Sequence, residues 1–216
     1  MLDRYRYAYL LATLGLLIIG RPFLPEFGRN FVIAMLALSL VTAAVTSATR
    51  RYQTWVGFAM TFAIVFVSLV PDDFAGLNTP VIYPLLGVIY WSLTAVLILR
   101  RIALRTTRIT ADTIYGAICV YLLMGLGWSH AYALLEAVQP GAFIISPEMI
   151  EVGGRSFERF IGFSFVTLTT LGYGNVVPLT PQGESLAIAE AITGQLYLAV
   201  LLARFVAMEI AARRGD

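Results

Sequence analysis

The chain has 216 residues, of which 59% are hydrophobic and only 13% are charged. Soluble domains carry about 25% charged residues, so this composition excludes an ordinary soluble enzyme and a disordered chain. The single cysteine, Cys119, cannot form an intrachain disulfide, and its apolar surroundings in the sequence predict a buried thiol. A formal net charge of +2 is too small to indicate a nucleic-acid-binding protein. The composition therefore predicts an integral membrane protein.

Six apolar runs are candidates for membrane-spanning helices, which need about 20 mostly apolar residues. Turn-forming residues separate these runs. The first and the third run are short for the hydrocarbon thickness, so we expect tilting or local thinning of the bilayer there. The runs are Tyr7–Gly20, Phe31–Ala48, Trp55–Val70, Val81–Leu99, Ala111–Ala137 and Glu184–Ile210. They predict an all-α membrane protein with six transmembrane helices.

The distribution of arginine predicts the orientation of the chain. All 15 basic residues are arginine, and an orientation with a cytoplasmic N-terminus places ten of them in inner segments and four in outer ones. Positive residues concentrate on the cytoplasmic side of membrane proteins. We therefore expect a multi-pass protein of the cell (inner) membrane, with both termini cytoplasmic.

The segment between the last two runs differs from the rest of the chain. Gln139–Arg155 is rich in proline and glycine and predicts an outer loop. Ser156–Thr169 is apolar but too short to cross a bilayer, which is typical of a re-entrant half-helix. Ser156 is a favourable N-cap residue for that helix.

Directly after this half-helix the chain reads Thr169-Thr170-Leu171-Gly172-Tyr173-Gly174-Asn175. Two glycines separated by one residue allow positive φ at alternate positions. Successive carbonyl oxygens can then point to the same side and replace the water shell of a cation, with the Thr170 hydroxyl as a further ligand. Non-helical backbone at membrane depth is tolerated only inside protein or along a water-filled path.

With these residues the chain resembles the tetrameric potassium channel family, of the prokaryotic six-transmembrane type with a Thr-Leu-Gly-Tyr-Gly selectivity filter. The resemblance implies a homotetramer that conducts K⁺ passively, without enzymatic activity and with no cofactor beyond the permeant K⁺ ions. It implies that K⁺ is bound by backbone or hydroxyl oxygens of Thr170, Leu171, Gly172 and Tyr173, with Gly174 completing the filter. It also implies a pore domain over 111–216 that holds an outer helix, a pore helix, the filter and an inner helix.

The sequence departs from the family pattern around the filter. Asn175 stands at the outer mouth where relatives commonly have aspartate, which weakens the focusing of cations there. Gly162 and Phe163 stand where many relatives have a tryptophan pair that braces the filter.

The inner helix carries further candidate residues. Gly194 lies at the position of a family hinge, although close helix packing explains a glycine equally well. Glu190 is a carboxyl at membrane depth that requires a partner, and we expect a structural brace to the pore-helix hydroxyl of Ser164 or Thr167. The family match makes one face of this helix the lining of the cavity, formed by Ala191, Gln195, Leu198 and Leu202.

The remaining chain, 1–110, predicts a four-helix N-terminal membrane domain that lacks voltage-sensor charges. Val81–Leu99 holds no charged residue, and the stripe of Arg101, Arg105 and Arg108 predicts an amphipathic cytoplasmic linker helix on the membrane surface. Gating would then rest on the pore, on membrane lipids or on an unidentified regulatory partner. Two alternatives remain open: a weakly selective monovalent cation channel of the same fold, and a non-conducting membrane scaffold subunit.

Overall fold

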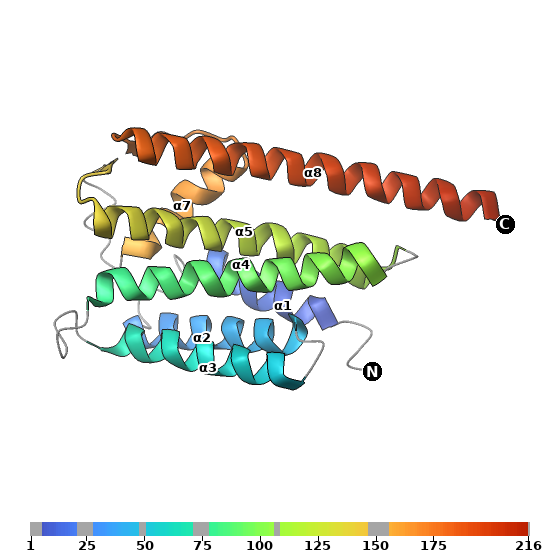
Figure 1. Ribbon diagram of the computed structural model, residues 1–216, viewed down its shortest axis with the longest axis horizontal. Helices are drawn as coiled ribbons and strands as arrows, with labels where there is room; N and C mark the ends of the chain where they lie inside the picture. Colours follow the sequence, from blue (N-terminus) through green and yellow to red (C-terminus); the bar gives the residue numbers. More distant parts are fainter. Residues whose placement is uncertain are drawn as a thin grey trace. The chain divides into compact units, whose positions relative to one another are not determined.

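The computed structural model describes residues 6–20, 28–47, 51–70, 78–105, 109–146 and 156–215, and these are mainly helical (Figure 1). Two short strands lie on either side of helix α7 in the sequence. The helices are α1 (Arg6–Gly15), its π-helical continuation η2 (Leu16–Gly20), α2 (Gly28–Ser47), α3 (Arg51–Leu69), α4 (Thr79–Arg105), α5 (Ala111–Val138), α7 (Ser156–Leu168) and α8 (Pro181–Gly215), and the strands are β1 (Phe143–Ile145) and β2 (Val176–Pro178).

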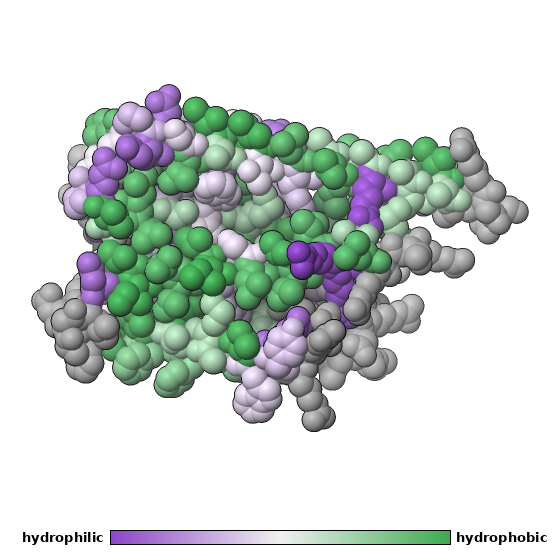
Figure 2. All heavy atoms as spheres, in the orientation of Figure 1, coloured by the Kyte–Doolittle hydropathy of each residue, from purple (hydrophilic) through white to green (hydrophobic). Residues whose placement is uncertain are grey.

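The predicted runs coincide with helices, apart from Val70, which follows the end of α3, and Ala48, which lies outside the described residues. The described residues include four helices long and apolar enough to cross a membrane. These four stretches are Tyr52–Leu69, Thr79–Leu104, Ala111–Val138 and Pro181–Ala211. Apolar stretches of α1 with η2 and of α2 are shorter, so a total of six spans stays a prediction. The face of the molecule in Figure 2 is covered mainly by hydrophobic residues, as expected for a surface in contact with lipid tails.

The chain folds as two compact units. The first comprises Met1–Val70, Ser92–Leu123 and Ala203–Asp216, and the second comprises Pro71–Trp91 and Met124–Leu202. Long helices such as α4, α5 and α8 contribute residues to both units. The predicted functional division into 1–110 and 111–216 concerns roles in conduction, and it stays a prediction.

In the first unit, α2 packs against both α1 and α3. Its core is built from fully buried aliphatic side chains, among them Leu10, Leu40 and Ile64. Cys119 is buried without a disulfide, which confirms the prediction of a buried thiol. The backbone amide of Tyr7 donates a hydrogen bond of 2.9 Å to the Asp112 carboxylate at the start of α5.

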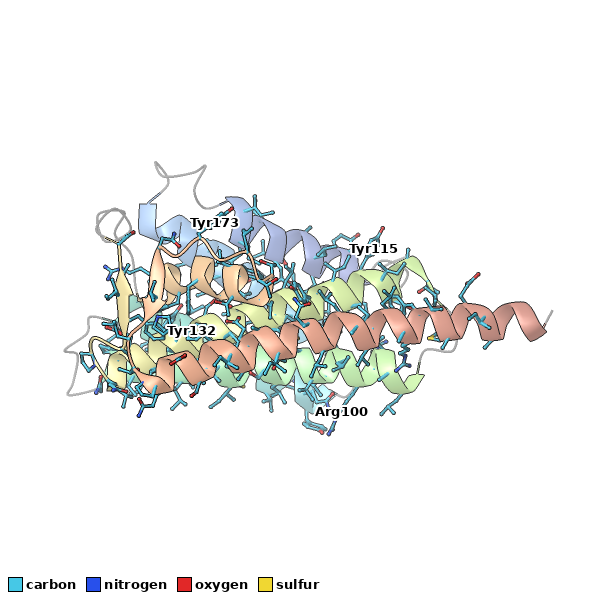
Figure 3. The ribbon with its side chains drawn as sticks, turned by 90° about the horizontal axis from the view of Figure 1, so that it is seen from above. Arg100, Tyr115, Tyr132 and Tyr173 are labelled. Atoms are coloured by element: carbon cyan, nitrogen blue, oxygen red, sulfur yellow. The ribbon has the colours of Figure 1, made fainter. Side chains whose placement is uncertain are left out.

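The end of α4 differs from the expected separate linker helix. Arg100, labelled in Figure 3, and Arg101 continue α4, which ends at Arg105, and Arg108 lies outside the described residues. Arg204 of α8 donates hydrogen bonds to the carbonyl oxygens of Ile102, at 3.1 Å, and Ala103, at 2.5 Å. The last four carbonyls of a helix lack partners within the helix, so Arg204 caps the C-terminal end of α4.

In the second unit, α7 begins at Ser156 as predicted and ends at Leu168. Strands β1 and β2 form a two-stranded antiparallel sheet in which Phe143 pairs with Pro178 and Ile145 with Val176. The sequence analysis predicted only a loop before α7 and no strand in an all-α fold. The sheet is therefore a feature that the sequence analysis did not predict. It joins the segment before α7 to the segment that follows the predicted filter.

Candidate functional site

The C-terminal end of α7 turns directly into the candidate filter. The amide of Leu171 donates to the carbonyl of Val166 at 2.8 Å, and the amide of Thr170 donates to the carbonyl of Thr167 at 3.0 Å. These two bonds form the Schellman motif that ends many helices. Its left-handed residue is normally glycine, but here it is Thr170, with φ of +59°.

A threonine at this position indicates a function for its hydroxyl group. The left-handed conformation costs an L-residue about 1–2 kcal/mol, and a β-branched residue is a clear outlier there. Within the described residues, Thr170 alone among non-glycine residues has positive φ. Strain of this kind persists mainly at functional sites. Glycine would relieve the strain but has no oxygen on its side chain, and the Thr170 hydroxyl is an oxygen that can bind a cation.

Positive φ recurs at every second residue after Thr170. Gly172 has φ of +74° and Gly174 has φ of +78°, which confirms the predicted conformations of both glycines. The residues from Leu171 to Gly174 are non-helical and exposed in the single chain, with 57% exposure for Leu171 and 72% for Tyr173 (Figure 3). A backbone in which the sign of φ alternates can turn successive carbonyl groups to one side, the arrangement that ion filters use.

The C-terminal end of this segment is fixed by main-chain bonds to the residues around β1. The carbonyl of Asn175 accepts a 3.0 Å bond from the amide of Ser146, and β2 then pairs with β1. The Glu136 carboxylate near the end of α5 accepts bonds from the amides of Gly141, at 2.9 Å, and Phe143, at 3.2 Å. The exit of the segment is therefore attached to α5 through β1.

Four aromatic side chains pack against one another: Tyr132, Phe143, Phe160 and Phe163. The ring centroids of Tyr132 and Phe163 lie 4.8 Å apart, and those of Phe143 and Phe160 lie 4.9 Å apart. Both pairs have the edge-to-face geometry that aromatic rings favour. Phe163 occupies the place where the family pattern has a bracing tryptophan, so in this chain a phenylalanine-rich cluster supports α7.

Glu190 lies at the junction of three helices and is completely buried. Its Oε1 atom lies 2.5 Å from the Ser164 hydroxyl of α7, which confirms one of the two predicted partners. Its Oε2 atom accepts a hydrogen bond from the Tyr132 hydroxyl of α5. The sequence analysis missed Tyr132, because nothing in the spacing along α5 showed which of its residues reaches α8.

Helix α8 packs closely against the end of α7. A Cβ atom added at Gly194 would lie 2.8 Å from both the carbonyl oxygen and the Cδ1 atom of Leu168. This observation supports close packing as the reason for the glycine, and bending at Gly194 stays a prediction.

The predicted cavity face of α8 is largely open in the single chain. Ala191 is half-buried, Gln195 is exposed, Leu198 is 43% exposed and Leu202 is 66% exposed. Apolar side chains on this face are therefore available for contact with other copies, with lipid or with a pore. The assignment of these four residues to a cavity stays a prediction.

Comparisons with known proteins agree with the location of this site. A family model described as "Ion channel" matches residues 114–210. Over 102 residues, which cover 47% of this chain and 75% of the relative, the chain is 33% identical to Protein LctB of Bacillus caldotenax. Over 89 residues it is 32% identical to a voltage-gated potassium channel of Aeropyrum pernix and to the inward rectifier potassium channel Kirbac3.1 of Paramagnetospirillum magnetotacticum. The aligned parts cover 26% and 28% of these two relatives. No solved structure matches the chain.

Proposed function

This chain belongs to the ion channel family, and we propose that it forms a potassium-selective channel that conducts K⁺ passively through a tetrameric filter. The observation that carries the proposal is the alternation of positive φ at Thr170, Gly172 and Gly174 in a non-helical segment directly after a half-helix. In a potassium filter, backbone carbonyl oxygens replace the water shell of the ion. The proposed ligands are the Thr170 hydroxyl and the main-chain oxygens from Thr170 to Tyr173.

The exposed filter segment supports assembly into a tetramer. In the single chain, residues 169–175 are exposed and their backbone lies outside any helix or strand. Within a membrane, such backbone must be covered by protein or must line a water-filled path. One copy supplies one row of oxygens, so four copies around an axis complete a cage and enclose the face of α8 that carries Gln195 and Leu202. Chemical cross-linking of the purified protein in mild detergent tests this assembly, and a stable monomer would contradict it.

We further propose that α4 does not sense voltage. No charged residue lies between Thr79 and Leu99 of this helix, and its described arginines begin at Arg100. A voltage sensor needs several charges within the membrane field. Current recorded from the channel in planar bilayers should therefore show an open probability that is nearly independent of voltage.

The measurement that tests potassium selectivity is the reversal potential of the purified protein in proteoliposomes with K⁺ on one side and Na⁺ on the other. We expect a reversal potential near the K⁺ equilibrium value and block by Ba²⁺. Equal permeability to Na⁺ and K⁺ would reject selectivity and favour a non-selective cation channel.

Two alanine variants provide a matched pair for this measurement. Gly172→Ala puts a side chain on a residue with positive φ, so we expect loss of conduction. Gly162→Ala changes an exposed residue of α7, where an added Cβ meets nothing within 4 Å, so selectivity should be unchanged. Conduction with wild-type selectivity in Gly172→Ala would mean that the conformation of the filter glycines is not what matters.

A further inference from the structure

Three pairs of oxygen atoms are close together around Glu190. The Tyr132 hydroxyl contacts Glu190 Oε2, the Ser164 hydroxyl lies 2.5 Å from Glu190 Oε1, and the same Ser164 oxygen lies 2.7 Å from the carbonyl oxygen of Gly125. Distances of this size between oxygen atoms are those of hydrogen bonds. Each of the three pairs therefore requires one hydrogen atom between its members.

The two hydroxyl groups supply only two of these hydrogens. A tyrosine hydroxyl and a serine hydroxyl each carry one hydrogen, a backbone carbonyl carries none, and an ionised carboxylate only accepts. The neighbouring hydroxyl of Ser129 uses its own hydrogen in a separate 2.7 Å bond to the carbonyl of Gly125. With an ionised Glu190, one of the three pairs would consist of two oxygen atoms facing each other without a hydrogen.

We infer that Glu190 carries the third hydrogen and is a neutral carboxylic acid that positions the pore helix. Its Oε1–H group donates to the Ser164 hydroxyl, Ser164 donates to the Gly125 carbonyl, and Oε2 accepts from Tyr132. The burial of the group agrees with this assignment, because Glu190 is completely buried and both side chains bonded to it are neutral. A buried ionised carboxylate would need a cationic partner or a full set of donors.

This chain of hydrogen bonds connects the helices that hold the filter. It runs from Tyr132 of α5 to Glu190 of α8, then to Ser164 of α7, and returns to α5 at Gly125. The two helices are very close at this point, since a Cβ atom added at Gly125 would lie 2.6 Å from the Phe165 ring. Ser164 lies six residues before Thr170, so the network fixes α7 just before the filter begins. The inferred effect on the filter rests on the proposed function, whereas the protonation state does not.

Infrared spectroscopy of the full-length protein in lipid at neutral pH tests the protonation state directly. We expect the Glu190→Gln variant to lose a carbonyl-stretching band of a protonated carboxyl group relative to the wild type. Glu184→Gln is the matched control, because Glu184 lies in the first turn of the same helix and is exposed, and it should lose only carboxylate bands. Loss of carboxylate bands from Glu190→Gln would overturn the inference, whether or not the protein conducts.

The positioning role is tested by the ratio of K⁺ to Na⁺ permeability in variants of the network. Glutamine reproduces the inferred pattern, because its amide oxygen can accept from Tyr132 and its amide nitrogen can donate to Ser164. Glu190→Gln should therefore keep the wild-type ratio, whereas Glu190→Leu should lower it because the Tyr132 and Ser164 hydroxyl groups both lose their bond to residue 190. Equal loss of selectivity in both variants would overturn the role. Should Glu190→Leu fail to assemble, Tyr132→Phe removes a single hydroxyl with little change in volume and is expected to lower the ratio. An unchanged ratio in Tyr132→Phe would then overturn the role.

Discussion

Replacement of Thr170 by glycine tests two properties of this segment separately. One is its contribution to the stability of the folded protein, and the other is the proposed binding of K⁺ by the Thr170 hydroxyl. Thr170 adopts a left-handed conformation with φ of +59°, which costs about 1–2 kcal/mol for an L-residue. Glycine removes this cost but gives the unfolded chain extra freedom, worth about 0.5–1 kcal/mol. The net gain is about 0–1.5 kcal/mol per subunit, with a midpoint of about 0.75 kcal/mol, or about 3 kcal/mol for a tetramer. The variant should therefore be more stable than the wild type when K⁺ is absent.

Potassium should reduce this advantage if the Thr170 hydroxyl is a ligand. A ligand that binds only the folded state stabilises it in proportion to the logarithm of its affinity, and each tenfold loss of affinity removes about 1.4 kcal/mol at saturation. Thr170→Gly lacks the hydroxyl oxygen, so added KCl should raise its melting temperature less than that of the wild type. The substitution should therefore raise the stability without K⁺ and reduce the stabilisation that K⁺ provides, and these two effects have opposite signs.

The assay is thermal denaturation of the purified protein in detergent, with N-methylglucamine chloride or KCl as the salt. Thr169→Gly is the control, because Thr169 does not have positive φ and its hydroxyl donates a 2.6 Å bond to the Phe165 carbonyl. This control should be less stable than the wild type in both salts. The reasoning is refuted if Thr170→Gly is destabilised without K⁺, or if KCl stabilises it as much as it stabilises the wild type.

The other predictions concern packing, capping and charge. Gly194→Ala should destabilise the protein by about 1–3 kcal/mol, because the added Cβ would overlap backbone at the end of α7. Gly162→Ala should be neutral or stabilising, because an added Cβ there meets nothing within 4 Å. Thermal unfolding of the two variants tests both predictions. Arg204→Met should lower stability by about 1.5–3 kcal/mol through loss of charged hydrogen bonds to α4, whereas Arg100→Met on the exposed surface should change it little in the same measurement. Asn175→Asp should raise single-channel K⁺ conductance at low ionic strength, and the gain should vanish in about 1 M salt, where the Debye length falls to about 3 Å.

Local patterns in the sequence predicted the parts of the site that depend on local chemistry. The helix over Ser156–Leu168 lies where the apolar pattern predicts one, and the positive φ of Gly172 and Gly174 follows from the freedom of glycine and is confirmed. The bond between Glu190 and Ser164 was predictable because a carboxyl at membrane depth needs a polar neighbour on an adjacent helix.

Other features were not predictable because they depend on contacts between distant segments. Strands β1 and β2 have three residues each, too few for an alternating pattern, and they form only through pairing with each other. The stripe of arginines after Leu99 has the same helical period whether the helix continues or a new one begins, so the sequence could not show that α4 extends to Arg105. The contact between Tyr132 and Glu190 was not predictable either, because it joins two helices that are distant in the sequence.

Helix α5 is connected to both ends of the predicted filter segment through one stripe of residues. Gly125, Ser129, Tyr132 and Glu136 are spaced by four, three and four positions, so they share one face of the helix. Gly125 and Tyr132 belong to the network that fixes α7 before the filter, and Glu136 binds the amides of β1, which pairs with the strand after the filter. A displacement of α5 along its axis would therefore move both ends of the predicted filter segment together. The stripe therefore connects α5 both to α7, through Gly125 and Tyr132, and to β1, through Glu136.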